Sequence, residues 1–370
     1  MKKTEANVGM FAGLQEAHEA PGEVAGTLRQ DEADTDFSVL QLVDGENYAL
    51  RKQNPKYKGW VEFIYASKPR DPMYVETEPG TRNVKSLLGP LPRRVQYVAP
   101  ELEEGRLDVI LLMCPSVCYL NPDLGEEKFK SFREQLEYAM RSKDEVLVTT
   151  RPATMEILDV RPLEGRASGY EENPNGPAAI EIETPEAPGR GEIQALAATA
   201  PISLAEATAE FDKLAAQVQI PFAFLRDCCT GRAHEMCRIM KLDGFSPRKV
   251  WNYGHGWAQS RKRPTLRVET NGVPEGFVKW SYHVAPIIPV HLSDGTIEEM
   301  VLDPSLFTTP VTIDEWVAKQ EDLTRETRKR TATYIWFDYL NGETLTDSRF
   351  TITYEQFRSH RAALNDEQNS

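Results

Sequence analysis

A stretch rich in proline, glycine, glutamate and alanine divides the sequence into two parts. It covers residues 163 to about 200 and includes Pro185-Glu186-Ala187-Pro188-Gly189. This composition disfavours a packed core and is typical of a linker or a long exposed loop. We therefore expect a domain on either side, at residues 21–162 and 201–370, and a flexible polar tail over residues 1–20. The alternative is a surface excursion within a single domain.

The overall composition excludes several classes of protein. The 370 residues are 40% hydrophobic and 27% charged, as in ordinary globular proteins. The net charge of -14 argues against a general nucleic-acid binder. No apolar run approaches the length of about eighteen residues that a membrane helix needs, and the polar N-terminus does not resemble a Sec signal peptide. We expect a cytoplasmic protein, or one exported without a Sec signal peptide, with no nucleic-acid or membrane partner; the oligomeric state stays open.

Short strands dominate the prediction for residues 21–162. Runs rich in β-branched and aromatic residues, such as residues 60–66, are typical of strands, and Asp44-Gly45 predicts a hairpin. Over residues 126–140, in contrast, apolar side chains recur at helical spacing. We expect a small β-rich domain with one helix, and a barrel is one arrangement that fits it.

Two helices are predicted near the start of residues 201–370. Ser203 and Glu206 form a capping-box pattern, and a second helix begins after Asp227, a residue suited to an N-cap. Cys229 then lies in the first turn, where unpaired N–H groups and the helix dipole favour a thiolate. Cys229 is therefore a candidate nucleophile, and the alternative is a small buried cysteine.

The cysteines indicate neither a disulfide framework nor a zinc site. The chain has five of them, which is few and an odd number. Cys229, His234 and Cys237 do not match the paired ligand spacings of zinc proteins. We expect no metal and no cofactor.

A histidine strand and an aspartate follow later in the chain. Alternation over residues 277–285 places the large apolar side chains on one face and His283 on a more polar face. The turn signal Asp294-Gly295 predicts a two-residue hairpin that returns Asp303 toward His283. In that register Asp303 lies opposite Pro286, on the wrong face, so either a β-bulge or a position beyond the ladder is needed. Without a nucleophile, a sheet histidine and a turn aspartate are the simpler interpretation.

Three segments in this order resemble the motifs of bacterial protein glutaminases. The resemblance covers about residues 200–320, and the family has glycine where this chain has Cys228. The matching segments are Asp227 to Met236, Trp280 to Pro286, and Leu302 to Phe307.

The resemblance implies an α+β fold like that of papain and transglutaminases for the C-terminal domain. It implies Cys229 as nucleophile, His283 as general base and acid, and Asp303 as the orienting carboxylate. The family deamidates glutamine side chains of proteins or peptides through a cysteine thioester and releases ammonia. Alternatives at the same site are acyl transfer, peptide cyclisation, transglutamination or peptide-bond cleavage. A catalytically silent binding protein is the non-enzyme alternative.

Several other side chains near these motifs have expected roles. Arg232 is expected to pin a loop, and His234 to satisfy a buried backbone group. Trp251, Tyr253 and Trp257 either line a substrate groove or pack in the core.

Overall fold

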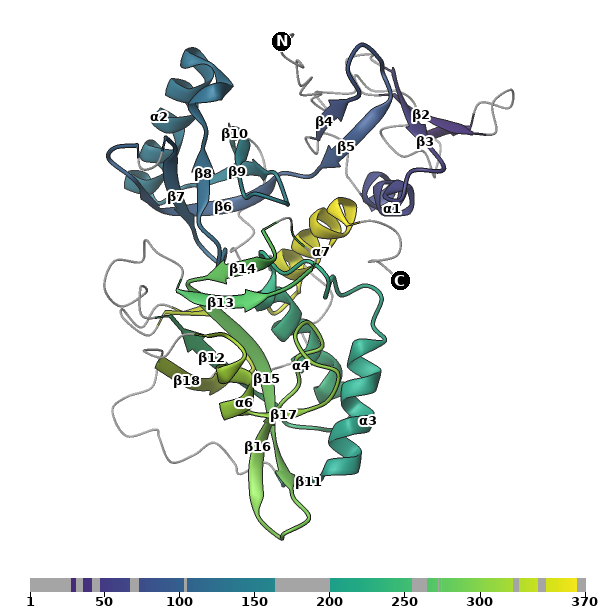
Figure 1. Ribbon diagram of the computed structural model, residues 1–370, viewed down its shortest axis with the longest axis vertical. Helices are drawn as coiled ribbons and strands as arrows, with labels where there is room; N and C mark the ends of the chain where they lie inside the picture. The colour runs from purple at the N-terminus through teal and green to yellow at the C-terminus, as the bar shows by residue number, and fades with distance from the viewer. Residues whose placement is uncertain are drawn as a thin grey trace. The chain divides into compact units, whose positions relative to one another are not determined.

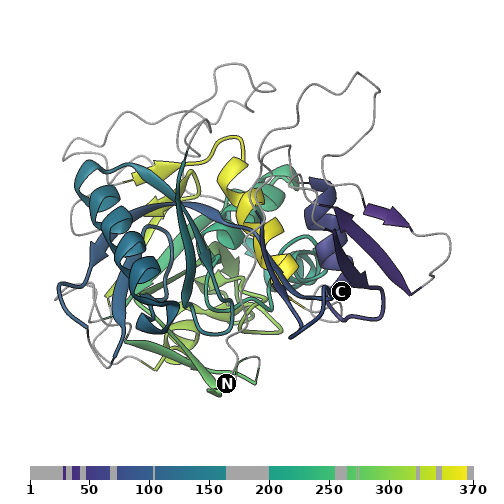
Figure 2. The same cartoon turned by 90° about the horizontal axis from the view of Figure 1, so that it is seen from above.

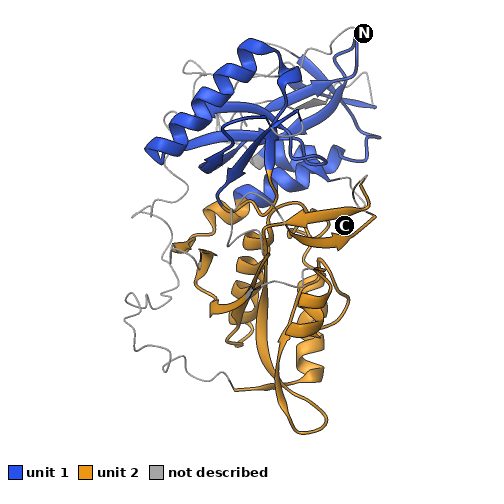
Figure 3. Ribbon diagram, turned by 60° about the vertical axis from the view of Figure 1, so that its left-hand side comes forward, with its two compact units in different colours: residues 1–112, 118–166, 355–370 blue, residues 113–117, 167–354 orange. Residues whose placement is uncertain are grey.

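The computed structural model describes two compact units (Figures 1 and 3). Unit 1 comprises residues 1–112, 118–166 and 355–370, and unit 2 comprises residues 113–117 and 167–354. The tail predicted over residues 1–20 and all but the two end residues of the predicted linker lie outside the described residues. The domain boundaries drawn from the sequence therefore stay a prediction. The described residues are 28–30, 36–41, 47–66, 73–102, 105–163, 200–254, 265–271, 273, 275–321, 326–338 and 344–364.

Unit 1 is rich in strands, as predicted for the N-terminal part of the chain. One sheet has the order β1-β2-β3, a second has the order β10-β9-β6-β7-β8, and β4 pairs with β5. Helix α2, which confirms the helix predicted from apolar spacing, packs against β6 and β10 (Figure 2). The elements are β1 (Leu28–Gln30), β2 (Phe37–Gln41), β3 (Asn47–Arg51), α1 (Tyr57–Ala66), β4 (Tyr74–Thr77), β5 (Val84–Leu88), β6 (Leu91–Val98), β7 (Leu107–Leu111), β8 (Cys118–Leu120), a 3-10 helix (Pro122–Leu124), α2 (Glu126–Ser142), β9 (Glu145–Thr150) and β10 (Ile157–Pro162).

Helix α1 corrects the strand predicted over residues 60–66. Trp60, Phe63 and Ile64 are spaced as on one face of a helix, and all three are buried in one core cluster with Leu40 of β2. The aromatic and β-branched content favoured a strand, but packing along a single helical face outweighs that preference. The described residues between 21 and 162 consequently contain two α-helices, α1 and α2, where the sequence predicted one.

Unit 2 has an α+β arrangement around a mainly antiparallel sheet of order β17-β16-β15-β12-β18, with the short strand β11 parallel to β15. Helix α4 packs against β15, and α3 begins with the predicted capping box of Ser203 and Glu206. The elements are β11 (Ile202–Ser203), α3 (Leu204–Ala215), α4 (Cys229–Leu242), β12 (Arg248–Tyr253), β13 (Leu266–Glu269), β14 (Phe277–Trp280), β15 (Tyr282–His291), β16 (Ile297–Val301), β17 (Val311–Thr312), α6 (Ile313–Ala318), β18 (Glu326–Thr331), β19 (Tyr334–Phe337), β20 (Thr344–Thr346) and α7 (Thr351–Ala363), whose residues from 355 belong to unit 1.

Strand β15 lies in the middle of this sheet and is buried along most of its length. Its odd-numbered residues Ala285 and Ile287 pack with Trp316 and Val317 of α6 in one core cluster. Because side chains alternate along a strand, His283 also points toward the α6 side. None of the described helices has the length and hydropathy that crossing a bilayer requires.

Candidate active site

The β15–β16 hairpin brings Asp303 to the face of the sheet that carries His283. His291 pairs with Ile297, so the register differs by one residue from that of the predicted two-residue turn. Continued along the chain, this register sets Asp303 level with Ala285, two residues from His283 and therefore on the same face. Asp303 follows the last residues of β16 and reaches His283 from beyond the ladder, which is one of the two solutions that the sequence allowed.

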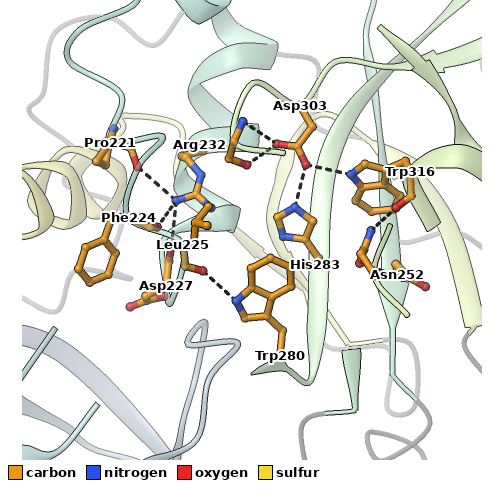
Figure 4. Close-up of polar contacts among 12 residues, drawn as sticks. Pro221, Phe224, Leu225, Asp227, Arg232, Asn252, Trp280, His283, Asp303 and Trp316 are labelled. Atoms are coloured by element: carbon orange, nitrogen blue, oxygen red, sulfur yellow. Dashed lines mark hydrogen bonds and ion pairs between the residues drawn. The ribbon is translucent and has the colours of Figure 1, made fainter. Parts of the chain in front are cut away.

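His283 and Asp303 form a buried hydrogen-bonded pair (Figure 4). His283 Nε2 lies 2.8 Å from Asp303 Oδ2, and Trp316 Nε1 donates to the same oxygen at 2.9 Å. The backbone N–H and the hydroxyl of Ser305 donate to Oδ1. Burial by itself would raise the pKa of Asp303, but His283, Ser305 and Trp316 hold that pKa at about 2. Asp303 is thus a carboxylate that accepts the Nε2 proton of His283, which leaves Nδ1 as the basic nitrogen of the neutral ring.

Two indole rings pack against the imidazole of His283. The ring of Trp280 stacks on it with centroids 4.6 Å apart, and the ring of Trp316 with centroids 5.4 Å apart. Trp280 also donates from Nε1 to the carbonyl of Leu225 at 2.8 Å. The prediction that Trp280 and His283 point to opposite faces is wrong, because the strand is interrupted at Ser281, between β14 and β15. His283 is not on a polar face but buried, with 1% of its surface exposed.

Cys229 is the first residue of helix α4, in the first turn as the sequence predicts. The N-cap is Cys228 rather than Asp227, whose carboxylate instead accepts a hydrogen bond from the backbone N–H of Cys228 at 2.6 Å. The first helical hydrogen bond runs from the N–H of Arg232 to the carbonyl of Cys228. The N–H groups of the first turn therefore have no acceptor within the helix.

The residue before the nucleophile has an unusual backbone. Cys228 has φ of 73°, in the left-handed region that favours glycine, and its side chain is fully buried. A non-glycine residue in this conformation costs about 1 kcal/mol. A glycine, the residue that the resemblance places at this position, would adopt this backbone conformation without that cost.

Arg232 holds the loop before Cys229 in place. Its Nη1 donates to the carbonyl of Phe224 at 2.6 Å, to that of Asp227 at 3.0 Å and to that of Pro221 at 3.4 Å (Figure 4). The sequence analysis expected this pinning role.

His234 and the neighbouring aromatic residues have structural positions. The Nε2 atom of His234 lies 3.2 Å from the carbonyl of Asp347, the kind of buried backbone contact that the sequence analysis expected. Trp251 and Tyr253 are fully buried, so they belong to the core and not to a groove, and Trp257 lies outside the described residues. The described part of the chain contains no cluster of histidine, cysteine and carboxylate side chains that could hold a metal ion.

The thiol of Cys229 lies beside the strand that carries His283. Burial raises the pKa of Cys229 to about 12; Arg232 and a backbone hydrogen bond from Val284 lower it, and the charge of Asp303 raises it. His283 Nδ1 is buried and has no hydrogen-bond partner among the described residues. The contacts between these described residues include no hydrogen bond from Cys229 to His283. The structure thus joins two of the three predicted site residues directly and places the sulfur next to Val284, the residue after His283.

Trp316 and Ser305, which both donate hydrogen bonds to Asp303, were not predicted from the sequence as site residues. Thr312 and Glu315 form a capping box, a pattern that is readable in the sequence and predicts a helix start just before Trp316. Nothing in the sequence indicates that this indole reaches Asp303, because the contact depends on how α6 folds back over β15.

Comparisons with known proteins agree with the resemblance seen in the sequence. Residues 207–320 match the model of a family described as glutaminase. A crystal structure of pro-protein-glutaminase has 20% identity and a TM-score of 0.46, covering 71% of this chain and 89% of that chain. The NMR structure of protein-glutaminase from Chryseobacterium proteolyticum has 21% identity and a TM-score of 0.33, covering 40% of this chain and 82% of that chain. No curated protein sequence matches this chain.

Proposed function

We propose that the protein is a cysteine-dependent amidohydrolase acting on glutamine side chains of proteins or peptides, since residues 207–320 match the model of a family described as glutaminase. The observation that carries this proposal is the hydrogen bond between His283 Nε2 and Asp303, which leaves His283 Nδ1 without a hydrogen-bond partner among the described residues. The next residue, Val284, contacts the thiol of Cys229. A nucleophile, a base and a residue that orients the base are the parts that acyl transfer through a thioester requires.

The first half of the proposed reaction forms the thioester. Since burial raises the pKa of Cys229 to about 12, the resting sulfur is a neutral thiol, and its proton leaves as the sulfur attacks. His283 Nδ1 accepts that proton while the sulfur bonds to the amide carbon. The free N–H groups at the start of α4 stabilise the negative oxygen. The protonated His283 then gives its proton to the departing nitrogen, the C–N bond breaks, and ammonia leaves.

The second half returns the enzyme to its starting state. A water molecule gives a proton to His283 Nδ1 and attacks the thioester carbon. The C–S bond breaks, the sulfur takes the proton back from His283, and the glutamine side chain leaves as glutamate. An amine in place of water would give transglutamination or cyclisation, and a backbone amide as substrate would give peptide cleavage.

Access to the site requires movement of its surroundings, because Cys229 and His283 are 2% and 1% exposed. Residues 113–117, which belong to unit 2, are hydrogen-bonded to the residues shortly before Cys229 and shortly before His283 in the chain. The hydroxyl of Ser116 donates to the carbonyl of Arg226 at 2.5 Å, and the N–H of Ser281 donates to the carbonyl of Pro115 at 2.8 Å. We include the release of this segment in the proposal as the step that admits substrate.

The direct test compares the wild-type protein with Cys229→Ala on a glutamine-containing peptide. We expect the wild type to release ammonia and to convert the amide to a carboxylate, seen as the corresponding gain in peptide mass, and Cys229→Ala to do neither. A mass decrease equal to the loss of ammonia would indicate cyclisation, and addition of a supplied amine would indicate transglutamination.

The matched control is Cys228→Gly, which removes the adjacent thiol and places glycine where φ is 73°. It should keep the activity, since the proposal gives the chemistry to Cys229 alone. Activity that survives in Cys229→Ala and disappears in Cys228→Gly would show that Cys228 is the nucleophile and would contradict the proposal. A wild-type protein that binds glutamine peptides and never alters them would favour the silent binding protein.

A further inference from the structure

We propose that Trp316 is a positioning residue of this site: its indole N–H and its ring together fix the carboxylate of Asp303 and the plane of His283. The inference rests on the proposed function for its kinetic meaning, but the contacts that carry it do not. Trp316 belongs to α6, outside the three segments that resemble glutaminase motifs.

The first observation is that Trp316 binds both members of the pair. Its Nε1 donates to Asp303 Oδ2 at 2.9 Å, the same oxygen that accepts from His283 Nε2. Its ring also stacks on the imidazole of His283 at 26° between planes (Figure 4). The carboxylate therefore cannot rotate away from His283 without losing the Trp316 hydrogen bond as well.

The second observation is that a second indole also stacks on the imidazole. The rings of Trp280 and His283 lie at 15° between planes, and both indoles are fully buried. An imidazole packed against two buried indoles keeps one plane, so Nε2 stays on Asp303 and Nδ1 stays directed away from it.

The third observation is that Trp316 is itself anchored. Gln320 Nε2 donates to the carbonyl of Trp316 at 3.0 Å, and Asn252 Nδ2 donates to Gln320 Oε1 at 2.9 Å. Asn252 pairs with His283 across β12 and β15. These hydrogen bonds thus connect Trp316 of α6 through Gln320 to Asn252 of β12, the residue that pairs with His283.

The test replaces one indole at a time. Trp316→Phe keeps an aromatic ring and removes the N–H that reaches Asp303, whereas Trp280→Phe removes an N–H that reaches only the carbonyl of Leu225. We expect Trp316→Phe to lower kcat by about 10- to 100-fold while KM stays within about twofold, since misplacement of a base slows chemistry more than binding. Trp280→Phe should lose clearly less kcat.

A double-mutant cycle with Asp303→Ala separates positioning from general loss of structure. If Trp316 acts through Asp303, adding Trp316→Phe to Asp303→Ala should reduce kcat by less than about twofold further. Losses that multiply, measured on folded protein as judged by thermal unfolding, would overturn the proposal, as would a wild-type kcat in Trp316→Phe. If Asp303→Ala does not fold, Asp303→Asn takes its place in the cycle.

The same double-mutant cycle can be measured with a second assay, the alkylation rate of Cys229, which needs no glutamine substrate. The rate at which iodoacetamide alkylates Cys229, located by mass spectrometry, should fall in Trp316→Phe because the base no longer assists the thiol. If the wild type releases no ammonia but alkylation shows the non-additive pattern, the glutaminase proposal fails and the role of Trp316 stands. If ammonia release is normal and both readouts are unchanged in Trp316→Phe, the role of Trp316 fails alone.

Discussion

Replacing Asp303 by asparagine tests the buried pair at the centre of the site. The Oδ2 atom of the carboxylate accepts hydrogen bonds from His283 and Trp316, and the Oδ1 atom accepts from Ser305. In either orientation of its amide, asparagine places an NH2 group, itself a donor, where one of these two oxygens accepts. The variant keeps the shape of the side chain and loses its charge. It should therefore fold less stably and orient His283 poorly.

The magnitude of the stability loss follows from the titration of the carboxyl group. The neighbours of Asp303 lower its pKa from 3.8 to about 2 in the folded protein. This difference corresponds to about 2 kcal/mol of stabilisation. Because the folded pKa lies below the unfolded one, the stabilisation is complete above the unfolded pKa and is lost as the pH falls toward 2. Asparagine does not titrate, so the gap between wild type and Asp303→Asn should be about 2 kcal/mol at pH 7 and close progressively below about pH 4.

Urea unfolding followed by circular dichroism at several pH values measures this gap. A difference that is the same at pH 7 and at pH 3 would refute the assignment of a stabilised carboxylate at this position. In the ammonia assay we expect kcat to fall by about 10³- to 10⁴-fold, as when the orienting acid of a triad is neutralised. A wild-type kcat in Asp303→Asn would remove Asp303 from the proposed mechanism.

Two further predictions concern the buried carboxyl group of Glu210 and the segment of residues 113–117. Burial and the charge of Asp243 raise the pKa of Glu210 to about 7, so this group disfavours the folded state increasingly as the pH rises from 4.5 through 7. Glu210→Gln should accordingly stabilise the protein by about 1–2 kcal/mol at pH 8 and little at pH 4, and an equal gain at both pH values in urea unfolding would contradict this. Ser116→Ala removes the hydroxyl that donates to Arg226, so alkylation of Cys229 by iodoacetamide should become about two- to tenfold faster, whereas Ser131→Ala on the exposed face of α2 should leave it unchanged. A rate in Ser116→Ala equal to that of wild type would remove residues 113–117 from the proposed access step.

Local patterns predicted the elements that need few distant contacts. The capping box at Ser203, the apolar spacing of α2 and the start of a helix at Cys229 depend on neighbours within a few residues, and the structure has all three. The helix α1 was missed because Trp60 and its neighbours are good strand formers, and their burial partners lie elsewhere in the chain.

The geometry of the site shows where such patterns stop being sufficient. The parity problem between His283 and Asp303 could be stated from the sequence, but its solution depends on the pairing of His291 with Ile297, which the turn residues alone did not give. The interruption at Ser281, which allows Trp280 to stack on His283, left no trace in the alternation of side chains. Long-range packing decided both.

The register of the β15–β16 hairpin limits how this part of the chain can change in length. Each residue added to one arm alone, with the turn unchanged, would reverse the phase between His283 and Asp303 and direct the carboxylate to the opposite surface of the sheet. Residues gained in matched pairs, one on each strand, would preserve that phase. Chains that share this site should therefore take up an odd change in the spacing between the two residues within the turn, or accompany an odd change within one arm by a compensating bulge.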